Sequence, residues 1–491
     1  MGELNRPYPP AHYPVVIIGS GPGGLQLSYC LSRLGVEHAL LSADDAPGGM
    51  FRRYPIFERL ITWTKPYAAY ERGERAYEWY DWNSLLGDEA EHRALVAEAS
   101  DGSRVYPARR EMEAGLAAFA ERAGVRARYD CRWEATRFDE HVTLRTTDGD
   151  YGCDVAVLAV GMTEPWVPPI EGIQHARHYV ETRPKEGYAG KTVLIIGKRN
   201  SGFEVADGLL PVARRIILAS PRPARVSVIA RSTAAARAVY LQPYEEHLLG
   251  GGTVVLDASI ERIERRQDGF RVTVTGTTRP GTLTVDVDEV IAATGFSTPL
   301  ADLPVHGLRR FSQERLPVQT PYWQGVGVDN VYFAGSVTQG SVGLMKHGIP
   351  SSSAAVHGFR YNARVLAEHL ARTRFGVDIP RPRVPDVVGR VLEEAAMGPE
   401  LWNQQGYLAR VISLDPSAGA RDEGILPLTA FLDDDDGDAI AVTIELDESG
   451  DIRPTVYRRH EGTIREARLG VDALRDPRTD DNRALLEELV R

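Results

Sequence analysis

The stretch that decides the fold is Val15-Val16-Ile17-Ile18-Gly19-Ser20-Gly21-Pro22-Gly23-Gly24. A second stretch of the same form occurs later in the chain, Thr192-Val193-Leu194-Ile195-Ile196-Gly197-Lys198-Arg199-Asn200-Ser201-Gly202. Each apolar run predicts a buried strand, and each glycine-rich continuation predicts a tight turn into a helix. The pyrophosphate of a dinucleotide binds bare backbone N–H groups at such a helix N-terminus, where glycine lets the backbone come close. Two loops of this kind predict two dinucleotides, and the usual reason for such a pair is hydride transfer from a nicotinamide to a flavin.

Length and composition are those of an ordinary globular protein. The 491 residues are enough for several domains, and 43% are hydrophobic while 25% are charged. The net charge of -11 argues against a nucleic-acid partner. Every apolar run is shorter than the roughly 18 to 20 residues of a membrane helix, and Met1 to Pro14 lacks the apolar core of a signal peptide. We therefore expect a cytoplasmic location, with no nucleic acid and no membrane as partner.

The chain has three cysteines, Cys30, Cys131 and Cys153. Their spacing contains no C-x-x-C pair, so the dithiol of a disulfide reductase is absent from the sequence. Small core residues are the expected role of these side chains. The sequence spacing also suggests no zinc site, and we expect no metal.

The pattern around the loops predicts an α/β protein with two Rossmann-like dinucleotide-binding domains and a small C-terminal α+β domain. Helices are expected at Glu111–Ala123 and Ser352–Arg372, an alternating segment at Asp154–Gly161 and a buried strand at Asn330–Ser336. We assign residues 1–165 and 289–376 to a discontinuous FAD-binding domain and residues 166–288 to an inserted NAD(P)H-binding domain. Residues 377–491 form the C-terminal domain of unknown role, with strands expected at Leu426–Leu432, Ala439–Leu446 and Pro454–Arg458.

The first loop is the expected FAD-binding turn. Its glycines Gly19, Gly21 and Gly24, with Ser20 and Pro22 between them, follow one strand and open a helix. A second strand, His38–Leu41, follows. The residue after that strand is usually acidic so that it binds the adenosine ribose hydroxyls. Here it is Ser42, with Asp44 and Asp45 just beyond, and a serine predicts weaker FAD retention.

The second loop is the expected nicotinamide site. Arg199 replaces the middle glycine between Gly197 and Gly202, where it either crowds the pyrophosphate or pairs with it. Asn200 and Ser201 complete the turn. Beyond the next strand, Arg222 and Arg225 stand where a 2′-phosphate would lie, which favours NADPH over NADH. Two alternatives stay open. The loop could keep the fold without its ligand, and the two arginines could be ordinary surface charges.

Further motifs carry a resemblance to a known family. The run Asn200 to Glu204 and the run Glu289 to Gly295 are similar to those of the class B flavin-containing monooxygenase superfamily. Within it, the chain most resembles the FAD-dependent oxidoreductase-domain branch and its bacterial relatives. That likeness covers roughly residues 12 to 370 and is carried by Arg53-Tyr54-Pro55, Leu60-Ile61, Asp81-Trp82-Asn83-Ser84-Leu85-Leu86 and Tyr106-Pro107. The class B signature between the loops survives only as His178, which argues against Baeyer–Villiger oxygenation.

The resemblance implies the remaining site residues. Those expected to line the cofactors are Gly49, Met50, Trp63, Gly161, Thr294, Gly335 and Ser336. Lys65, Lys346 and His347 are the catalytic candidates, which would anchor an anionic substrate or hydrogen-bond the oxygenated flavin.

The expected function is that of an FAD- and NADPH-dependent monooxygenase that oxidises a nitrogen or sulfur of a small molecule through a C4a-(hydro)peroxyflavin. Two alternatives remain. One is a flavoprotein NAD(P)H dehydrogenase or reductase without oxygen insertion, and the other is a catalytically decayed flavin-binding scaffold. The expected partner is a small-molecule substrate, and a homodimer through the C-terminal domain is a further open expectation.

Overall fold

The computed structural model describes residues 6–227, 235–344, 346, 350–434, 437–446 and 451–491. Its described residues divide into two compact units. The first unit comprises Met1–Arg52, Thr62–Gly161 and Thr298–Arg491, and the second comprises Arg53–Ile61 and Met162–Ser297. Each unit is built around its own parallel sheet, as the two quoted stretches predict. Of the described helices, none is long and apolar enough to cross a membrane.

The first sheet combines a parallel half with an antiparallel half. Parallel strands β2, β1, β5 and β17 contain the most buried residues, because strands covered on both faces have no polar side. The amino half of β5 pairs instead with β4, which pairs with β3. The bounds are β1 His12–Ile18, β2 His38–Leu41, β3 Trp133–Phe138, β4 Val142–Thr146, β5 Gly149–Leu158 and β17 Val331–Phe333.

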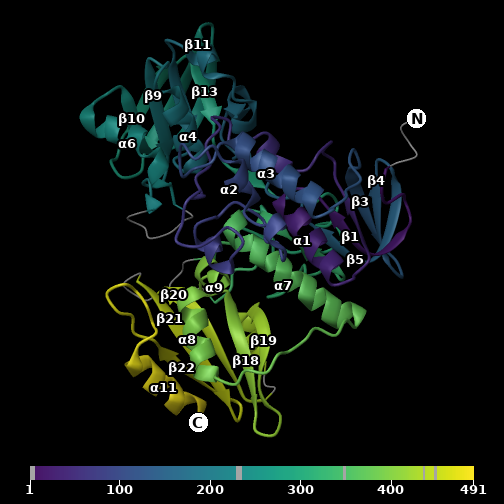
Figure 1. Ribbon diagram of the computed structural model, residues 1–491. Coiled ribbons are helices and arrows are strands. Elements are labelled where there is room, and N and C mark those ends of the chain that lie inside the picture. Colours follow the sequence, from purple (N-terminus) through teal and green to yellow (C-terminus); the bar gives the residue numbers. More distant parts are fainter. Residues whose placement is uncertain (1–5, 228–234, 345, 347–349, 435–436, 447–450) are drawn as a thin grey trace. The chain divides into compact units, whose positions relative to one another are not determined.

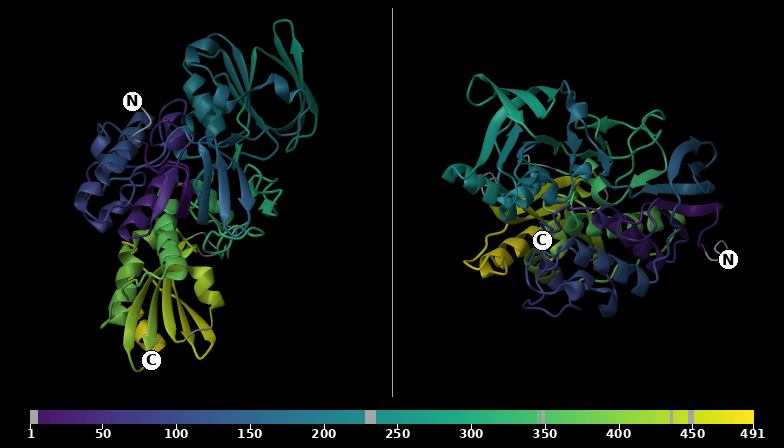
Figure 2. Two further views of the ribbon diagram at one scale, coloured as in Figure 1. Left: turned by 90° about the vertical axis from the view of Figure 1, so that its right-hand side faces the viewer. Right: turned by 90° about the horizontal axis from the view of Figure 1, so that it is seen from above.

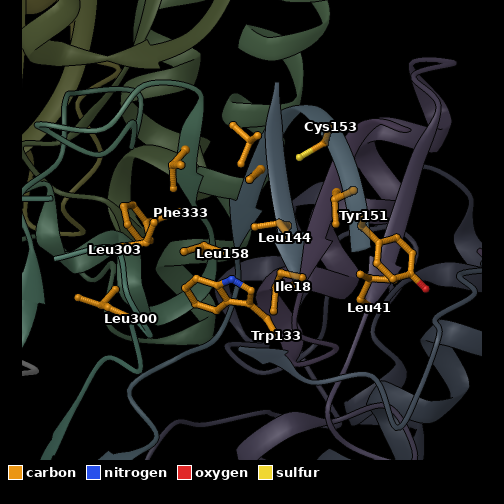
Figure 3. Close-up of a cluster of buried hydrophobic side chains, with 14 of the residues drawn as sticks. Ile18, Leu41, Trp133, Leu144, Tyr151, Cys153, Leu158, Leu300, Leu303 and Phe333 are labelled. Atoms are coloured by element: carbon orange, nitrogen blue, oxygen red, sulfur yellow. The ribbon is translucent and has the colours of Figure 1, made fainter. Parts of the chain in front are cut away.

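Figure 3 shows the apolar cluster on one face of this sheet. Ile18, Leu41 and Leu158 come from the carboxyl ends of three parallel strands, and Trp133 and Leu144 come from the antiparallel strands. The later segment 300–333 adds further members, among them those labelled Leu300, Leu303 and Phe333. The cluster therefore joins the two halves of the sheet and the returning chain into one core.

Helices cover the other face of the first sheet. Helix α1 (Pro22–Arg33) packs along α7 (Val356–Phe375), which is long and follows the return of the chain through β17. Helices α2 (Leu95–Ala99) and α3 (Arg109–Arg122) pack on each other. Shorter elements of this part are η1 Gly49–Arg52, η2 Arg75–Trp79, η3 Ala90–His92, β15 Arg310–Phe311, β16 Leu316–Pro317 and η8 Gly335–Gly340.

The second unit is the inserted domain. Its sheet has the order β12-β11-β10-β9-β8-β13-β7. The first residues of β10 and the strands β9, β8, β13 and β7 run parallel to one another. Helix α4 (Asn200–Leu209) follows β8, and α6 (Gln242–Leu249) packs beside β10. The strands are β6 Glu164–Pro165, β7 Arg177–His178, β8 Thr192–Ile196, β9 Arg215–Ser220, β10 Thr253–Arg266, β11 Gly269–Gly276, β12 Thr282–Val287, β13 Glu289–Ala292 and β14 Phe296–Ser297. The 3-10 helices are η4 Ile173–His175, η5 Tyr179–Glu181, η6 Lys185–Tyr188 and η7 Ala238–Tyr240.

Besides its start, which is Met162 where residue 166 was predicted, this unit differs from the predicted boundaries in two further places. Strand β13 was assigned to the second FAD segment, but it pairs in parallel with β8, so the chain returns to the first unit only at Thr298. The segment Arg53–Ile61 packs with the second unit although its sequence neighbours belong to the first. Both differences arise from pairing and packing with residues distant in sequence.

The C-terminal part is an antiparallel sheet with helices on both faces. The strand order is β19-β18-β20-β21-β22, and the strands lie side by side below α7 in the left view of Figure 2. Buried side chains of α8 and α11 cover one face, and α10 covers the other. The bounds are α8 Val387–Met397, α9 Pro399–Asn403, β18 Leu408–Asp415, β19 Gly419–Pro427, α10 Leu428–Asp433, β20 Ala439–Leu446, β21 Ile452–His460, β22 Thr463–Arg468 and α11 Asp480–Val490.

One predicted strand of this part is wrong in most of its length. The stretch Leu426–Leu432 contributes two residues to the end of β19, and the chain then turns into α10. Leu428 and Phe431, three residues apart, are buried against the sheet. A short apolar run therefore meets the helical spacing as well as the strand spacing, and here tertiary packing selects the helix.

Within the first unit, an ion-pair cluster around the buried Glu394 connects the C-terminal part to the segment that contains Arg75. The guanidinium of Arg75 donates to both oxygens of Glu394 at 3.0 Å and pairs with Glu400. Glu394 also pairs with Arg410 at 3.4 Å, and its side chain is fully buried. Although burial opposes ionisation, these arginines lower the pKa of Glu394 to about 2. The carboxylate therefore stays ionised inside the protein.

We expect Glu394→Gln to destabilise the protein by about 3 kcal/mol at pH 7, because it removes the buried negative charge that Arg75, Arg390 and Arg410 share. A folded-state pKa near 2 lies below the ordinary 4.5, so the carboxylate stabilises above pH 4.5 and loses this contribution as pH falls toward 2. Urea unfolding should show the gap between wild type and variant shrinking to roughly half or less by pH 3. Glu98→Gln is the matched control, since its pair with Arg122 is exposed and should cost less than about 1 kcal/mol. Equal losses in the two variants would contradict this assignment.

Candidate functional site

The carboxyl edge of the first sheet gathers most of the predicted FAD-binding residues. Strands β1, β2, β5 and β17 are parallel and end at Ile18, Leu41, Leu158 and Phe333. Ligands of open α/β sheets bind outside this edge. The residues that follow the strand ends, directly or within a few positions, are Gly19 to Gly24, Ser42, Gly161, Gly335 and Ser336.

Two glycines of the first turn are fixed by backbone packing. Gly19 has φ +110°, and a Cβ there would lie 2.5 Å from the carbonyl oxygen of Ala159. A Cβ on Gly24 would lie 1.8 Å from the carbonyl oxygen of Gly19. Neither position accepts a side chain, so these glycines set the helix directly against the strand ends.

Gly21 is different, because neither its backbone nor its neighbours exclude a side chain. Its φ is −72°, and a Cβ would find its nearest described atom, the Cα of Gly49, at 3.8 Å. None of the described side chains caps the N-terminus of α1, and its first turn contains no acidic residue. The bare backbone N–H groups thus face an open approach beside Gly21, which fits the pyrophosphate of a dinucleotide.

Ser42 lies at the predicted ribose position but is already engaged. The hydroxyl of Ser20 donates to Ser42 Oγ at 2.8 Å, and the backbone N–H of Asp44 donates to the same oxygen at 3.2 Å. Both serines are buried. Ser42 therefore ties the first loop to the end of β2 and keeps one proton to donate, whereas a carboxylate could accept from both ribose hydroxyls.

The predicted flavin-facing residues lie on an irregular segment. Gly49 and Met50 begin η1, and the backbone of Gly49 approaches that of Gly21. The indole of Trp63 is 38% exposed and packs against Trp82, with ring centroids 5.0 Å apart.

Lys65 is held by its backbone and carries its ammonium over an aromatic ring. Its N–H donates to the carbonyl of Tyr80 at 2.8 Å, and the hydroxyl of Tyr77 donates to its carbonyl at 2.5 Å. Its Nζ lies 5.1 Å from the ring centre of Tyr80. The lysine is therefore presented from a fixed backbone, and its catalytic role stays a prediction.

The motif Asp81 to Ser84, which carried the resemblance, is the scaffold of this segment. Asp81 Oδ1 accepts from Thr64 Oγ1 at 2.8 Å and from the backbone N–H groups of Asn83 and Ser84. The amide of Asn83 donates to the carbonyl of Trp63 at 3.2 Å. The buried motif thus fixes the backbone that carries Trp63 and Lys65.

Lys346 is engaged by the C-terminal sheet. Its Nζ pairs with Glu445 at 2.8 Å and with Glu466 at 2.9 Å, and it donates to the hydroxyl of Tyr457. Three partners use the three protons of an ammonium. The structure therefore gives Lys346 a role in neutralising these carboxylates. His347, the third catalytic candidate, lies outside the described residues.

The second loop repeats the glycine geometry of the first. Gly197 has φ +129°, and a Cβ there would lie 2.3 Å from the carbonyl oxygen of Ala293. A Cβ on Gly202 would lie 2.3 Å from the carbonyl oxygen of Gly197. Arg199 takes the middle position with extended backbone and an exposed side chain, and none of the described side chains caps α4. The turn thus keeps an open helix N-terminus, with a cation in place of the second glycine.

The neighbours of the second loop have separate roles. Asn200 Oδ1 accepts from the backbone N–H of Arg237 at 2.9 Å, whereas Ser201 is half-buried in the first turn of α4. Lys198, which sequence reasoning passed over, is buried and donates to Leu256 O at 2.7 Å and to Asp257. Burial lowers the pKa of Lys198.

Arg222 and Thr294 also lie in the second unit. Arg222 and Arg225 are exposed shortly after the carboxyl end of β9, the strand beside β8. Thr294 Oγ1 donates to Trp166 O at 2.6 Å. Thr294, predicted as a cofactor contact, thus holds the backbone of Trp166 just after β6, and its cofactor role stays a prediction.

Glu204 is a buried carboxylate that the sequence showed only as part of a motif. Its Oε1 accepts from the backbone N–H of Phe57 at 3.0 Å, and its Oε2 accepts from the hydroxyl of Tyr179 at 2.5 Å. Burial raises the pKa of Glu204. A Cβ on Gly208 would meet the ring of Phe57 at 2.4 Å, so this glycine makes room for the same segment. The motif on α4 therefore holds Arg53–Ile61 on the second unit.

His178, the remnant of the class B signature, is a structural residue here. Its Nε2 donates to Gly295 O at 3.2 Å, and its Nδ1 accepts from the backbone N–H of Val180. Burial lowers the pKa of His178, which keeps the ring neutral in this arrangement.

All three cysteines are free and buried. Burial raises the pKa of Cys30 to about 11 and of Cys153 to about 12, and it also raises the pKa of Cys131. A thiol needs a lowered pKa to act as a nucleophile in exchange. The structural role predicted for these side chains fits their burial.

The two glycine turns on two parallel sheets define a protein with two dinucleotide-binding domains. The family described as pyridine nucleotide-disulphide oxidoreductase matches residues 16–335, and the chain belongs to this family. FAD and NAD(P)H are the cofactors typical of it. The predicted fold class and family are thereby confirmed.

Named proteins and solved structures are similar to this chain over most of its length. The chain is 27% identical over 428 residues to FAD-dependent oxidoreductase domain-containing protein 2 of Danio rerio, which covers 75% of this chain. The chain spans 60% of that relative's length. Among solved structures, bacillithiol disulfide reductase of Staphylococcus aureus has a TM-score of 0.56 at 14% identity, covering 74% of this chain and 99% of its own. A flavin-containing monooxygenase of Stenotrophomonas maltophilia has a TM-score of 0.53 at 20% identity, covering 74% and 98%. Both structures show the shared fold.

We expect Gly21→Ala and Gly24→Ala to fail in different ways. In Gly21→Ala the methyl group stands in the open approach to the helix N-terminus, so FAD affinity should fall about tenfold or more while the FAD-free protein keeps its thermal stability. In Gly24→Ala the methyl group meets a carbonyl oxygen, which should cost about 1–3 kcal/mol of stability. Flavin content and thermal unfolding of both forms measure this. Gly187→Ala, at an exposed glycine with an ordinary φ, is the control. Unchanged FAD retention in Gly21→Ala would remove the loop from the cofactor site.

Proposed function

We propose that this protein is an FAD- and NADPH-dependent monooxygenase that oxidises a nitrogen or sulfur of a small molecule. The observation that carries the proposal is that two helices, α1 and α4, begin at glycine-rich turns without a cap from a described side chain, while all three cysteines are free and buried. Two dinucleotide sites supply a hydride donor and a flavin acceptor. The three buried thiols form no exposed dithiol that could receive the electrons, so we infer that the electrons pass to an acceptor outside this chain.

Oxygen is the acceptor that the motifs favour. When bound, FAD would supply the two-electron chemistry between the nicotinamide and oxygen. The chain contributes position and charge: Gly21 and the N-terminus of α1 hold the pyrophosphate, and Ser42 offers one proton to the ribose. Lys65, on its fixed backbone, is the cation proposed to orient an anionic group of the substrate.

Charge at the second loop supports NADPH as the donor. Arg199 is exposed in the turn itself, and Arg222 and Arg225 are exposed beyond the carboxyl end of β9. In the part of the chain that the structure describes, no ion pair neutralises Arg222. A guanidinium at this position suits the 2′-phosphate, which NADH lacks.

Arg222→Ala should lower kcat/KM for NADPH by about 10- to 100-fold, the cost of one charge-assisted hydrogen bond to phosphate, and should leave NADH nearly unaffected. Steady-state flavin reduction with both nucleotides measures the two ratios. Arg215→Ala is the matched control, because this exposed arginine lies at the opposite end of the same strand. A parallel loss with NADPH and NADH would contradict recognition of the 2′-phosphate.

Rapid mixing tests whether oxygen is the electron acceptor. The purified protein is reduced by NADPH without air and then mixed with oxygenated buffer while the visible spectrum is followed. We expect a transient spectrum that matches neither oxidised nor reduced flavin and that lasts longer with NADP⁺ bound. An amine or thioether substrate should shorten its lifetime and gain one oxygen atom by mass spectrometry.

Other outcomes would overturn the monooxygenase assignment. Immediate return of the oxidised spectrum with one hydrogen peroxide per NADPH would identify an oxidase or a reductase that hands electrons to another acceptor. Failure to bind FAD, or to be reduced by NADPH, would identify a scaffold that keeps only the fold.

A further inference from the structure

Three potential metal ligands meet on one face of the first sheet, at the end opposite the glycine turn. His12 is the first residue of β1, His141 directly precedes β4, and Asp154 lies within β5. The register pairs His12 with Gly152 and Val142 with Cys153, so His141 lies across from Asp154. Neighbouring strands thus bring His12 to two side chains that lie more than a hundred residues further along the sequence.

The distances between the ligand atoms of this triad suit a cation with tetrahedral coordination. His12 Nε2 lies 3.2 Å from Asp154 Oδ1, and His141 Nδ1 lies 3.3 Å from the same oxygen. Zinc binds histidine nitrogen and carboxylate oxygen at about 2.0–2.2 Å, which makes the ligand-to-ligand edges of a tetrahedron about 3.3–3.5 Å. The three ligand atoms all lie within 4.8 Å of one another. Only small side-chain adjustments are needed to point them at one ion.

The backbone prepares the site and leaves it accessible. A Cβ on Gly152 would lie 3.0 Å from Nδ1 of His12, so the absence of a side chain there makes room for the imidazole. The two imidazole rings are 4.7 Å apart. The side chains of His12, His141 and Asp154 are 46%, 55% and 41% exposed, so an ion with its waters can enter from solvent.

We propose that His12, His141 and Asp154 form a binding site for a divalent transition-metal cation, Zn²⁺ by the chemistry of the ligands, with water completing the coordination. Two imidazoles and one carboxylate suit zinc better than magnesium or calcium, which prefer oxygen ligands. His12 lies six residues before Ile18, so the site is about 20 Å along the strand from the glycine turn. Zinc bound here would link three neighbouring strands. Because it would bind the folded chain and not the unfolded one, it would stabilise the folded state by mass action.

The test is zinc binding to untagged, full-length, FAD-loaded protein that a chelator has first stripped of metal. Equilibrium dialysis with elemental analysis should give one bound zinc per chain, and saturating zinc should raise the Tm. His141→Gln and Asp154→Asn should each lose this bound zinc and the rise in Tm, while their flavin content and circular dichroism match the wild type.

His306→Gln is the matched control. His306 Nε2 lies 3.2 Å from Asp302 Oδ2, the same separation as in the triad, but this pair is not part of such a ligand group among the described residues. The control should keep the bound zinc. Absence of stoichiometric zinc from the wild type, or its retention in both triad variants, would overturn the proposal. Because the readouts are zinc content and Tm, the result is independent of the oxidation chemistry proposed above.

Discussion

The close approach of bare backbone to carbonyl oxygens at each strand-to-helix turn is the constraint on which both dinucleotide sites depend. Gly19 and Gly24 in one sheet, and Gly197 and Gly202 in the other, have no space for a Cβ. This contact seats each helix so that its uncapped N–H groups open at the carboxyl edge of the sheet. The middle position is free of that constraint, so it can be glycine in the first loop and Arg199 in the second.

The parallel cores could be predicted from sequence because their signals are local. An apolar run of four or five residues followed by glycines at fixed spacing identifies β1 with α1, and β8 with α4. The boundary of the inserted unit could not be predicted, since β13 joins β8 by pairing with residues almost a hundred positions away. The C-terminal α10 was missed for a related reason, because a short, mostly apolar stretch such as Leu426–Leu432 fits a strand or a helix until its packing partner is known.

The candidate sites divide in the same way. Loop residues such as Gly21 and Ser42 could be predicted from spacing, and the structure places them at the carboxyl edge of the first sheet, while their cofactor roles stay predictions. In the sequence, Glu204 was noted only as part of a motif. Its structural role follows from its hydrogen bonds with Phe57 and Tyr179, which no local pattern connects to it. The His12 triad could not be predicted either, because its side chains are brought together by strand pairing and have no metal-ligand spacing along the chain.

The C-terminal part, which carried no recognisable chemistry in its sequence, has a physical connection to the segment proposed to face the flavin. Arg360 on α7 donates to the carbonyls of Asp81 and Ser84, and Asp81 in turn holds Thr64. A few residues earlier, Arg75 is bound to Glu394 and Glu400 of the C-terminal part. The segment that includes Trp63 and Lys65 is thus held at two points by guanidinium groups, the buried Arg360 and the partly exposed Arg75, which pairs with buried C-terminal carboxylates. Such pairs are costly to break and hold a single geometry, so the C-terminal part helps to set the shape of this segment without supplying a reacting group.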